Sequence, residues 1–478
     1  MAEQLTPRSH LVRLMPMLVY TLVYAGTCLI GAFLLLVDWR PFAAYFEYFS
    51  GTESPDLTDS EFATTFVLLV VAPVLMWMGF LAVTYVHLRP VDRVVARIAS
   101  ARLNLPPALP VALFAVSLTT ALISLAQAGS FSHIGSWLDY ADWITARQTV
   151  FAQMGFAAFV NIYLLVPLSA AWIAVTTRPR GRGLAIIVIT TTLAIGVQLL
   201  LFQKKAAIVA VLIVLTAIAL HFTGQAAARR LRWALPASIL VLAAVYFALV
   251  VLPVYVESRQ TVQTIVAAEG EDSRSPTPVS PEQRERLKRL AEELGLDNRT
   301  KSLVMYSMLS PLTRSSAASL YYADVFPGRH PFYGFGLADG KPTDDTRVVW
   351  DYMNPTLPGG TVAAPFQFGM FALWGLVGAL AACAAAGVGL ALLWRVVVAS
   401  RPPQDWQSLS GSLVVLLAVY LAIDSAQNSI LVSYGVFWGF LFVAAAVGLA
   451  AALRRTNEPW ARKDSESVGD GARRNPRA

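Results

Sequence analysis

The feature that most constrains this chain is a series of apolar stretches long enough to cross a lipid bilayer. A helix crosses the hydrocarbon core with about 20 residues. Ten stretches reach or approach that length: 15–37, 62–86, 110–128, 150–175, 184–202, 206–223, 233–256, 366–394, 409–427 and 429–453. Only 14% of the 478 residues are charged, whereas about 25% are charged in an average soluble domain. This composition excludes a soluble enzyme, a disordered chain and a fibrous repeat. The sequence therefore predicts an all-α polytopic membrane protein of about ten transmembrane helices.

Arginines between the stretches predict the orientation, because positive residues concentrate in cytoplasmic loops. The arginine-bearing connections include 87–109, 176–183, 224–232 and 395–408, and they alternate with poorly basic ones. The acidic segment 38–61 is an example of the second kind. Both termini are therefore predicted to be cytoplasmic, and odd-numbered connections face outward. The net charge of +7 is explained by these loops, so no nucleic-acid partner is predicted.

Four segments follow from this topology. They are a bundle of seven spans over 1–256, a large outward loop over 257–365, three further spans over 366–453, and a basic cytoplasmic tail over 454–478. A kinked or re-entrant element at 424–428 is an alternative to the break between the last two spans. Within the loop, a capping-box pattern at Ser280 predicts a short amphipathic helix that ends near Gly295, with its cations on a solvated face. A second helical pattern covers 301–323.

Motifs for metal and nucleotide binding are missing from the sequence. There is no HExxH, no P-loop, no GxGxxG before a strand and no metal-type spacing of cysteine and histidine. The two cysteines, Cys28 and Cys383, lie inside apolar stretches and indicate neither a disulfide framework nor a metal site. The sequence therefore predicts no cofactor and no metal.

Cations on the predicted outward side are the strongest functional signal. Positive charge is normally sparse there, yet this side carries Arg147, Lys204, Lys205, Arg259, Arg314 and Arg329. Arginine suits bidentate binding of phosphate, so the set indicates an anionic, phosphate-bearing partner. The alternative is that each cation pairs with a neighbouring carboxylate or extends along the membrane interface.

The layout and several local patterns resemble the bacterial O-antigen or oligosaccharide repeat-unit polymerases. The layout is about ten spans with one large outward loop before the last spans. The local patterns are Arg147 before the span from Gly155 to Pro167, Gln203-Lys204-Lys205 before an aliphatic span, Arg314 followed by Tyr321-Tyr322 and Phe326-Pro327, the glycine turn Pro331–Gly336, and Gly359-Gly360-Thr361 with Pro365. Gln203 stands where that family often has glycine or serine.

The resemblance implies a metal-independent glycosyltransferase at the outer face of the bacterial inner membrane. It would join undecaprenyl-diphosphate-linked oligosaccharides, with membrane lipid and possible contact to a chain-length regulator protein as further partners. Fixed cations would stabilise the charge that grows on the leaving diphosphate. The residues so implied are Arg147, Arg314, Lys204, Lys205 and Arg259 for the diphosphate, Asp324, His330 and Glu257 as candidate general bases, and Tyr321, Tyr322 and Tyr333 for sugar stacking.

Three other functions fit the same sequence. An O-antigen ligase would use the same donor with a different acceptor. A polyprenyl-phosphate-sugar-dependent glycosyltransferase would place catalytic acids in the first outward loop, which carries Glu47, Glu53, Asp56 and Asp59. A lipid-linked oligosaccharide flippase or other transporter is disfavoured, because such folds are typically built from repeats with polar residues along their spans.

Overall fold

The structure is a computed structural model of the whole chain. It describes residues 7–50, 55–86, 89–90, 92–93, 95, 108–138, 140–177, 181–202, 204–222, 281–295, 299–334, 345–353, 362–399, 404–424 and 435–448. All regular secondary structure in these ranges is helical. The predicted all-α class is therefore confirmed for this part of the chain.

Seven of the described helices are long and apolar enough to cross a membrane. They run over Val12–Leu36, Asp59–Tyr85, Ala108–Gln127, Phe156–Thr176, Arg182–Leu199, Phe366–Val397 and Asp405–Ile423. Two shorter apolar helices cover Ala206–Phe222 and Val436–Gly448. These nine overlap nine of the ten predicted stretches, while 233–256 lies outside the described residues. The protein is thus an α-helical, multi-pass membrane protein, and its orientation stays a prediction.

Several of these helices turn large apolar side chains away from the protein. Met78 on α5 (Ala72–Tyr85) is 59% exposed, Val116 on α7 (Ala108–Gln127) 62%, and Ile189 on α11 (Arg182–Leu199) 57%. Water would make such surfaces aggregate, whereas lipid tails solvate them without cost. The outer faces of these helices therefore suit a hydrocarbon environment.

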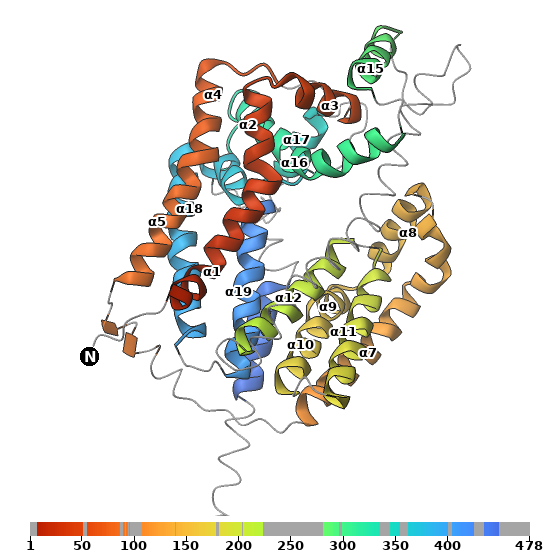
Figure 1. The fold of residues 1–478 in the computed structure, drawn as a ribbon, viewed down its shortest axis with the longest axis vertical. Coiled ribbons are helices and arrows are strands. Elements are labelled where there is room, and N and C mark those ends of the chain that lie inside the picture. Colours follow the sequence, from red (N-terminus) through yellow and green to blue (C-terminus); the bar gives the residue numbers. More distant parts are fainter. Residues whose placement is uncertain are drawn as a thin grey trace, which may run out of the picture.

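The spans form two groups that meet at α19 (Asp405–Ile423) (Figure 1). The first group contains α1 (Pro7–Tyr24), η1 (Ala25–Leu29), α2 (Ile30–Leu36), α4 (Asp59–Phe66), η2 (Val67–Val71), α5 and α18 (Phe366–Val397). The second contains α7, α9 (Phe156–Val160), η4 (Asn161–Leu165), α10 (Val166–Thr176), α11 and α12 (Lys204–Phe222). Helix α19 packs against α1 and α18 on one side and against α10 and α12 on the other, so it joins the groups.

Glycines allow close helix packing in the first group. A Cβ atom at Gly79 on α5 would overlap the backbone of Ala384 on α18, and a Cβ at Gly387 on α18 would overlap the carbonyl of Met76 on α5. Small residues permit this backbone approach, which replaces hydrophobic driving force with van der Waals contact inside a membrane. The α5–α18 pair is therefore held by packing that no larger side chain would permit.

Three spans contain a turn of π-helix, which interrupts the regular i→i−4 bonding of the backbone. Two carbonyls in these turns accept bonds from side chains on neighbouring helices. Tyr24 Oη donates to the carbonyl of Leu69 at 2.9 Å, and Gln198 Nε2 donates to the carbonyl of Ile162. An unsatisfied carbonyl in an apolar bundle is costly, so these side chains stabilise the irregular turns.

Tyr24→Phe should lower the free energy of unfolding by about 1 kcal/mol, because it leaves the Leu69 carbonyl without this donor. Tyr20 offers a matched control, because it stacks on Tyr24 with 5.7 Å between ring centroids. Its hydroxyl is buried and has no hydrogen-bond partner among the residues that the structure describes. Tyr20→Phe should therefore leave stability unchanged or raise it. Unfolding in mixed detergent micelles with increasing SDS measures both, and equal destabilisation by the two changes would contradict the proposed cap.

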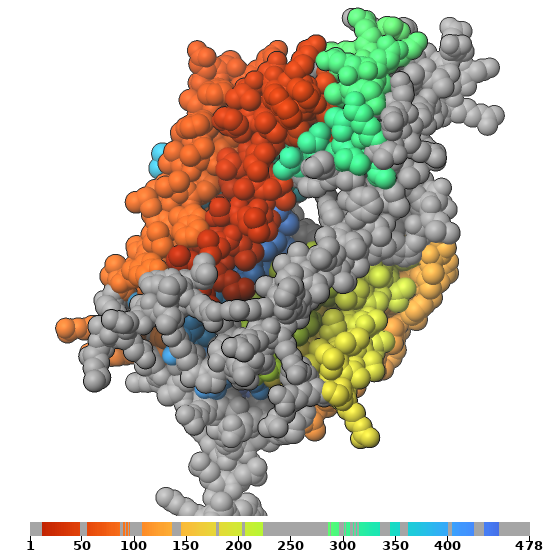
Figure 2. Space-filling view, viewed as in Figure 1, coloured from red at the N-terminus to blue at the C-terminus, as the bar shows by residue number. Residues whose placement is uncertain are grey.

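Four helices lie at the end of the first group where α4 begins (Figure 1). They are α3 (Arg40–Ser50), α15 (Pro281–Leu294), α16 (Arg299–Val325) and α17 (Asp345–Met353). Helices α15 and α16 confirm the two helices predicted in the large loop. Helix α15 docks on α3 through an ion pair of Arg286 with Glu47 and a second between Arg40 and Glu293 at 3.8 Å. Figure 2 shows green α15 against the red N-terminal residues.

Helix α16 lies directly on the membrane-spanning helices. A Cβ at Gly31 of α2 would overlap the carbonyl of Leu312, and Ser319 Oγ lies 3.2 Å from Cys28 Sγ. Buried Ala317, Ala318 and Leu320 extend this contact within the main core. Helix α16 therefore packs onto the bundle and shares its hydrophobic core.

Candidate functional site

Helix α8 (Tyr140–Gln153) carries Arg147 and corrects the predicted start of the fourth span. The apolar pattern predicted one span over 150–175, but α8 ends at Gln153 and the membrane helix begins at Phe156. Gly155 separates them with an extended backbone, φ −67° and ψ 151°, as the N-cap of α9. Arg147 therefore lies within a separate helix, where it is exposed.

The structure places α8 against the turn that leads into α12. Ala146 and Val150 of α8 are buried together with Ala128 and Phe202. Phe202 precedes the lysine pair, and α12 begins at Lys204. The side chains of Lys204 and Lys205 lie outside the described residues. The helix carrying Arg147 therefore packs against the turn that precedes Lys204.

The other predicted cations are located only in part. Arg314 lies on α16, two helical turns before Tyr321, and its side chain lies outside the described residues. Glu257 and Arg259 also lie outside the described residues. Figure 1 shows α8 in the second helix group and α16 at the end of the first. The predicted site residues therefore fall into two regions.

An ion pair between Asp324 and Arg329 is the centre of the second region. Nε and Nη2 of Arg329 lie 3.2 and 3.1 Å from the same oxygen, Oδ1 of Asp324. The guanidinium also lies over the ring of Tyr352, with Cζ 4.3 Å from the centroid. The Asp324 side chain is 11% exposed and that of Arg329 is 57% exposed. The carboxylate is thus enclosed, while the guanidinium covers it and reaches the surface.

Tyr352 on α17 joins this pair. Burial raises the pKa of the Tyr352 phenol, and a hydrogen bond with Asp324 and the charge of that carboxylate raise it further. Arg329 acts in the opposite direction, and Glu61 at the start of α4 adds to the increase. The raised pKa keeps the Tyr352 hydroxyl protonated at neutral pH, and its ring lies against the Arg329 guanidinium. The cluster draws on α4, α16, α17 and the turn after α16.

The three predicted sugar-binding tyrosines have different environments. Tyr321 is 8% exposed and packs edge-on against Tyr352, with centroids 5.9 Å apart. Tyr322 is fully buried and donates from its hydroxyl to Oδ2 of Asp345 at 2.8 Å. Tyr333 is half-buried and contacts the ring of His330, with 4.9 Å between centroids. Tyr333 is therefore the most accessible of the three for a ligand, and Tyr322 occupies a core position.

His330 follows the ion pair directly in the chain. Its Nδ1 lies 2.7 Å from the carbonyl oxygen of Pro331. A carbonyl oxygen accepts and does not donate, so the bond places the proton on Nδ1. In the neutral ring, Nε2 then holds the lone pair and is the proton acceptor. This arrangement suits one of the roles predicted for His330, that of a general base.

A break in α18 lies beside this segment. Gly375 has φ 69° and ψ −171° inside the helix, a backbone conformation that favours glycine. The carbonyls of Ala372 and Leu373, just before the break, accept from the backbone N–H groups of Tyr333 and Gly334 at 3.1 and 2.7 Å. The turn after α16 is therefore fixed to α18 by its backbone.

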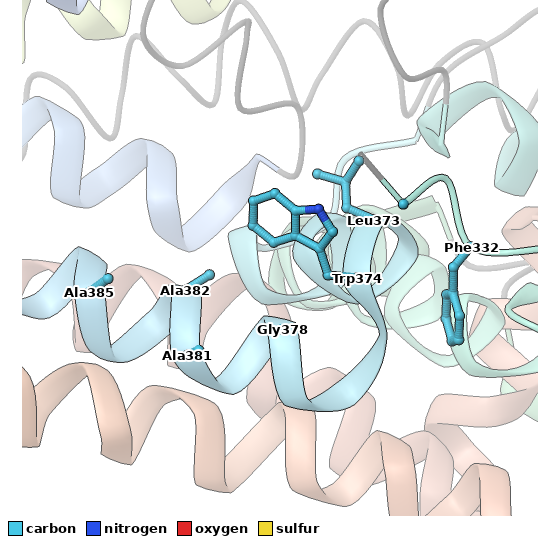
Figure 3. Close-up of a pocket in the computed structure, with 8 residues that line it drawn as sticks. Phe332, Leu373, Trp374, Gly378, Ala381, Ala382 and Ala385 are labelled. Carbon is cyan, nitrogen blue, oxygen red and sulfur yellow. The ribbon is translucent and has the colours of Figure 1, made fainter. Parts of the chain in front are cut away.

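An open apolar groove of about 670 Å³ runs along α18 from this break. It is lined by Phe332, Gly334, Leu373, Trp374, Gly378, Ala381, Ala382 and Ala385. Figure 3 shows the side chains of Trp374 and Phe332 near one end and the small residues following along the helix. Gly378 and the alanines leave space that larger side chains would fill. None of the described residues that line the groove is charged, so it suits an apolar ligand.

The segment from Arg329 to Gly334 thus connects two different surfaces. Arg329, His330 and Tyr333 belong to the polar and aromatic cluster, while Phe332 and Gly334 line the groove. Within the described residues, no group of three or more His, Cys, Asp or Glu side chains is placed to hold a metal ion. Comparisons of this chain with protein-family models, with curated proteins and with solved structures found no match.

Proposed function

We propose that this protein is a membrane glycosyltransferase that polymerises polyprenyl-diphosphate-linked oligosaccharides at the outer face of a bacterial inner membrane. One observation carries the proposal: a polar, aromatic cluster with an exposed arginine directly adjoins an apolar groove on a membrane helix. A lipid-linked saccharide is amphiphilic in the same sense, with a sugar and diphosphate at one end and an isoprenoid chain at the other.

The reaction transfers a saccharide between two lipid-linked units. A hydroxyl oxygen of the acceptor forms a bond to the anomeric carbon of the donor. The bond between that carbon and the diphosphate oxygen breaks, and its electron pair leaves with polyprenyl diphosphate. The hydroxyl proton passes to a general base, for which His330 Nε2 is the best-placed candidate among the described residues. Cations near the leaving diphosphate lower the barrier by stabilising its growing charge.

The alternative hypothesis, a polyprenyl-phosphate-sugar-dependent glycosyltransferase with catalytic acids in segment 38–61, receives less support. Glu47 is engaged by Arg286 of α15. Glu61 accepts from the backbone N–H of Thr58 at 2.8 Å, and Thr58 and Glu61 together form a capping box at the start of α4. These contacts are structural roles in helix docking and helix capping. Glu47 and Glu61 are therefore poorer candidates than the cluster around Asp324, and Glu53 lies outside the described residues.

Deletion of the gene tests the proposed function. We expect single repeat units to accumulate and long glycan chains to disappear, as seen by gel electrophoresis and mass spectrometry of surface glycans. The wild-type gene supplied in trans should restore the long chains. Long chains that stay on the lipid carrier would instead identify a ligase, and full-length repeats lacking one sugar would identify a monosaccharide transferase. Unchanged glycans would overturn the proposal.

A further inference from the structure

The Asp324–Arg329 pair is asymmetric, and the asymmetry separates the roles of its two members. Nε and one N–H of Nη2 face Asp324 Oδ1. The remaining N–H groups of the guanidinium, including both on Nη1, have no protein partner among the described residues. The Arg329 side chain is 57% exposed, about five times the 11% of Asp324. One edge of the Arg329 guanidinium is therefore bound to Asp324, and the other edge faces outward.

We propose that Arg329 binds the diphosphate of the lipid-linked substrate and that Asp324 and Tyr352 are the positioning residues that hold it in place. This inference rests on the proposed function and names the residue that recognises the charged part of the substrate. An arginine has five N–H donors in a rigid plane. A carboxylate on one edge and an aromatic ring beneath fix that plane, so the outward edge loses little rotamer freedom when an anion binds.

The burial of Asp324 argues against its predicted role as a general base. Both hydrogen bonds of Arg329 to this carboxylate converge on Oδ1. The Asp324 side chain is only 11% exposed and the guanidinium lies over it, so an incoming hydroxyl has little access to the carboxylate. The same contacts suit a carboxylate that orients an arginine.

The position of Arg329 relative to the groove supports this assignment. Arg329 lies three residues before Phe332, which lines the groove. Backbone bonds from Tyr333 and Gly334 fix the following residues to α18. An anion at Arg329 would thus lie close to the end of an apolar chain in the groove. A polyprenyl diphosphate has this arrangement of charge and hydrocarbon.

The test is binding of undecaprenyl diphosphate to the purified full-length protein in detergent, with undecaprenol as the uncharged probe. Arg329→Gln should weaken binding of the diphosphate at least tenfold and leave undecaprenol binding unchanged. Arg329→Lys should give an intermediate loss, because lysine keeps the charge without the fork. Arg347→Gln is the matched control: Arg347 is 55% exposed and ion-paired with Asp351 on α17, and its loss should change nothing. Size-exclusion elution verifies that each variant is folded.

Asp324→Asn separates positioning from proton transfer. A positioning role predicts a higher KM and weaker diphosphate binding with a kcat within a few-fold of wild type. A general base predicts a kcat lower by about 10²-fold or more with unchanged diphosphate binding, and that result would overturn the inference. Equal binding of the diphosphate by wild-type protein and by the Arg329→Gln variant would overturn this inference but not the proposed function. Wild-type protein that binds no diphosphate would overturn the proposed function as well.

Discussion

Gly387→Leu should prevent the protein from accumulating in the membrane. A side chain at Gly387 would overlap the carbonyl of Met76, which belongs to the backbone of α5 and has no freedom to rotate away. The substitution would force α5 and α18 apart and remove contacts along their whole length. Overpacking of a core commonly costs about 1–3 kcal/mol even when side chains adapt, and a rigid backbone neighbour places this change at or above that range. Immunoblotting of membranes and size-exclusion chromatography in detergent measure the loss.

Gly389 provides the control for this substitution. It lies two residues further along α18, and a Cβ there would meet no atom of the described part of the chain within 4 Å. Gly389→Leu should therefore accumulate at close to the wild-type level. The comparison is matched, because both variants add the same leucine to the same helix. Equal abundance of the two variants would contradict the close approach of α5 and α18.

Arg147→Ala should lower polymerisation about 10²-fold while leaving abundance near normal. Removal of one group that stabilises transition-state charge commonly costs this factor. Arg147 is exposed on α8, so its loss should remove little packing. Glycan chain length in complemented deletion cells, normalised to the amount of protein in the membrane, measures the effect. Arg147→Lys should retain part of the activity, since it keeps the charge.

Gln148 is the matched control for Arg147, because it is the next residue on α8 and is also exposed. Gln148→Ala should support normal chain lengths. A low amount of the Arg147→Ala protein would mean that this arginine stabilises the fold. Normal chain lengths with Arg147→Ala would show that Arg147 does not contribute to binding the diphosphate.

The spans could be predicted because lipid imposes a simple condition on composition. A helix that crosses hydrocarbon must be apolar for about 20 residues and must satisfy its own backbone, and both properties are visible in a single sequence. Local breaks were harder to predict. The apolar pattern continues through Met154–Gly155, where the helix ends, because hydropathy does not report the extended backbone of Gly155. The π turns at Ala25–Leu29 and Val67–Val71 are likewise invisible to hydropathy, because their residues are nearly all apolar, like the rest of their spans.

The candidate site could be predicted only in its composition. Aromatic and charged residues between 321 and 352 could be identified from the sequence as candidates. The residues that they contact could not be predicted. Tyr352 and Asp324 meet because α17 folds back on α16, which sequence spacing does not reveal. Tyr321 and Tyr322 were both predicted to stack on sugars, yet neighbours on a helix point about 100° apart. Only Tyr321 therefore faces Tyr352, while Tyr322 enters the core.

The backbone link between the turn after α16 and the break in α18 has a consequence for ligand size. Three peptide units separate the Cα atoms of Arg329 and Phe332, so these atoms are at most about 11 Å apart. The bonds of Tyr333 and Gly334 to α18 fix the groove end of this interval. The binding surfaces for charge and for hydrocarbon therefore lie a short, limited distance apart. An amphiphile whose charge is next to its hydrocarbon can occupy both surfaces at once. An amphiphile with a long polar spacer between charge and hydrocarbon can occupy only one.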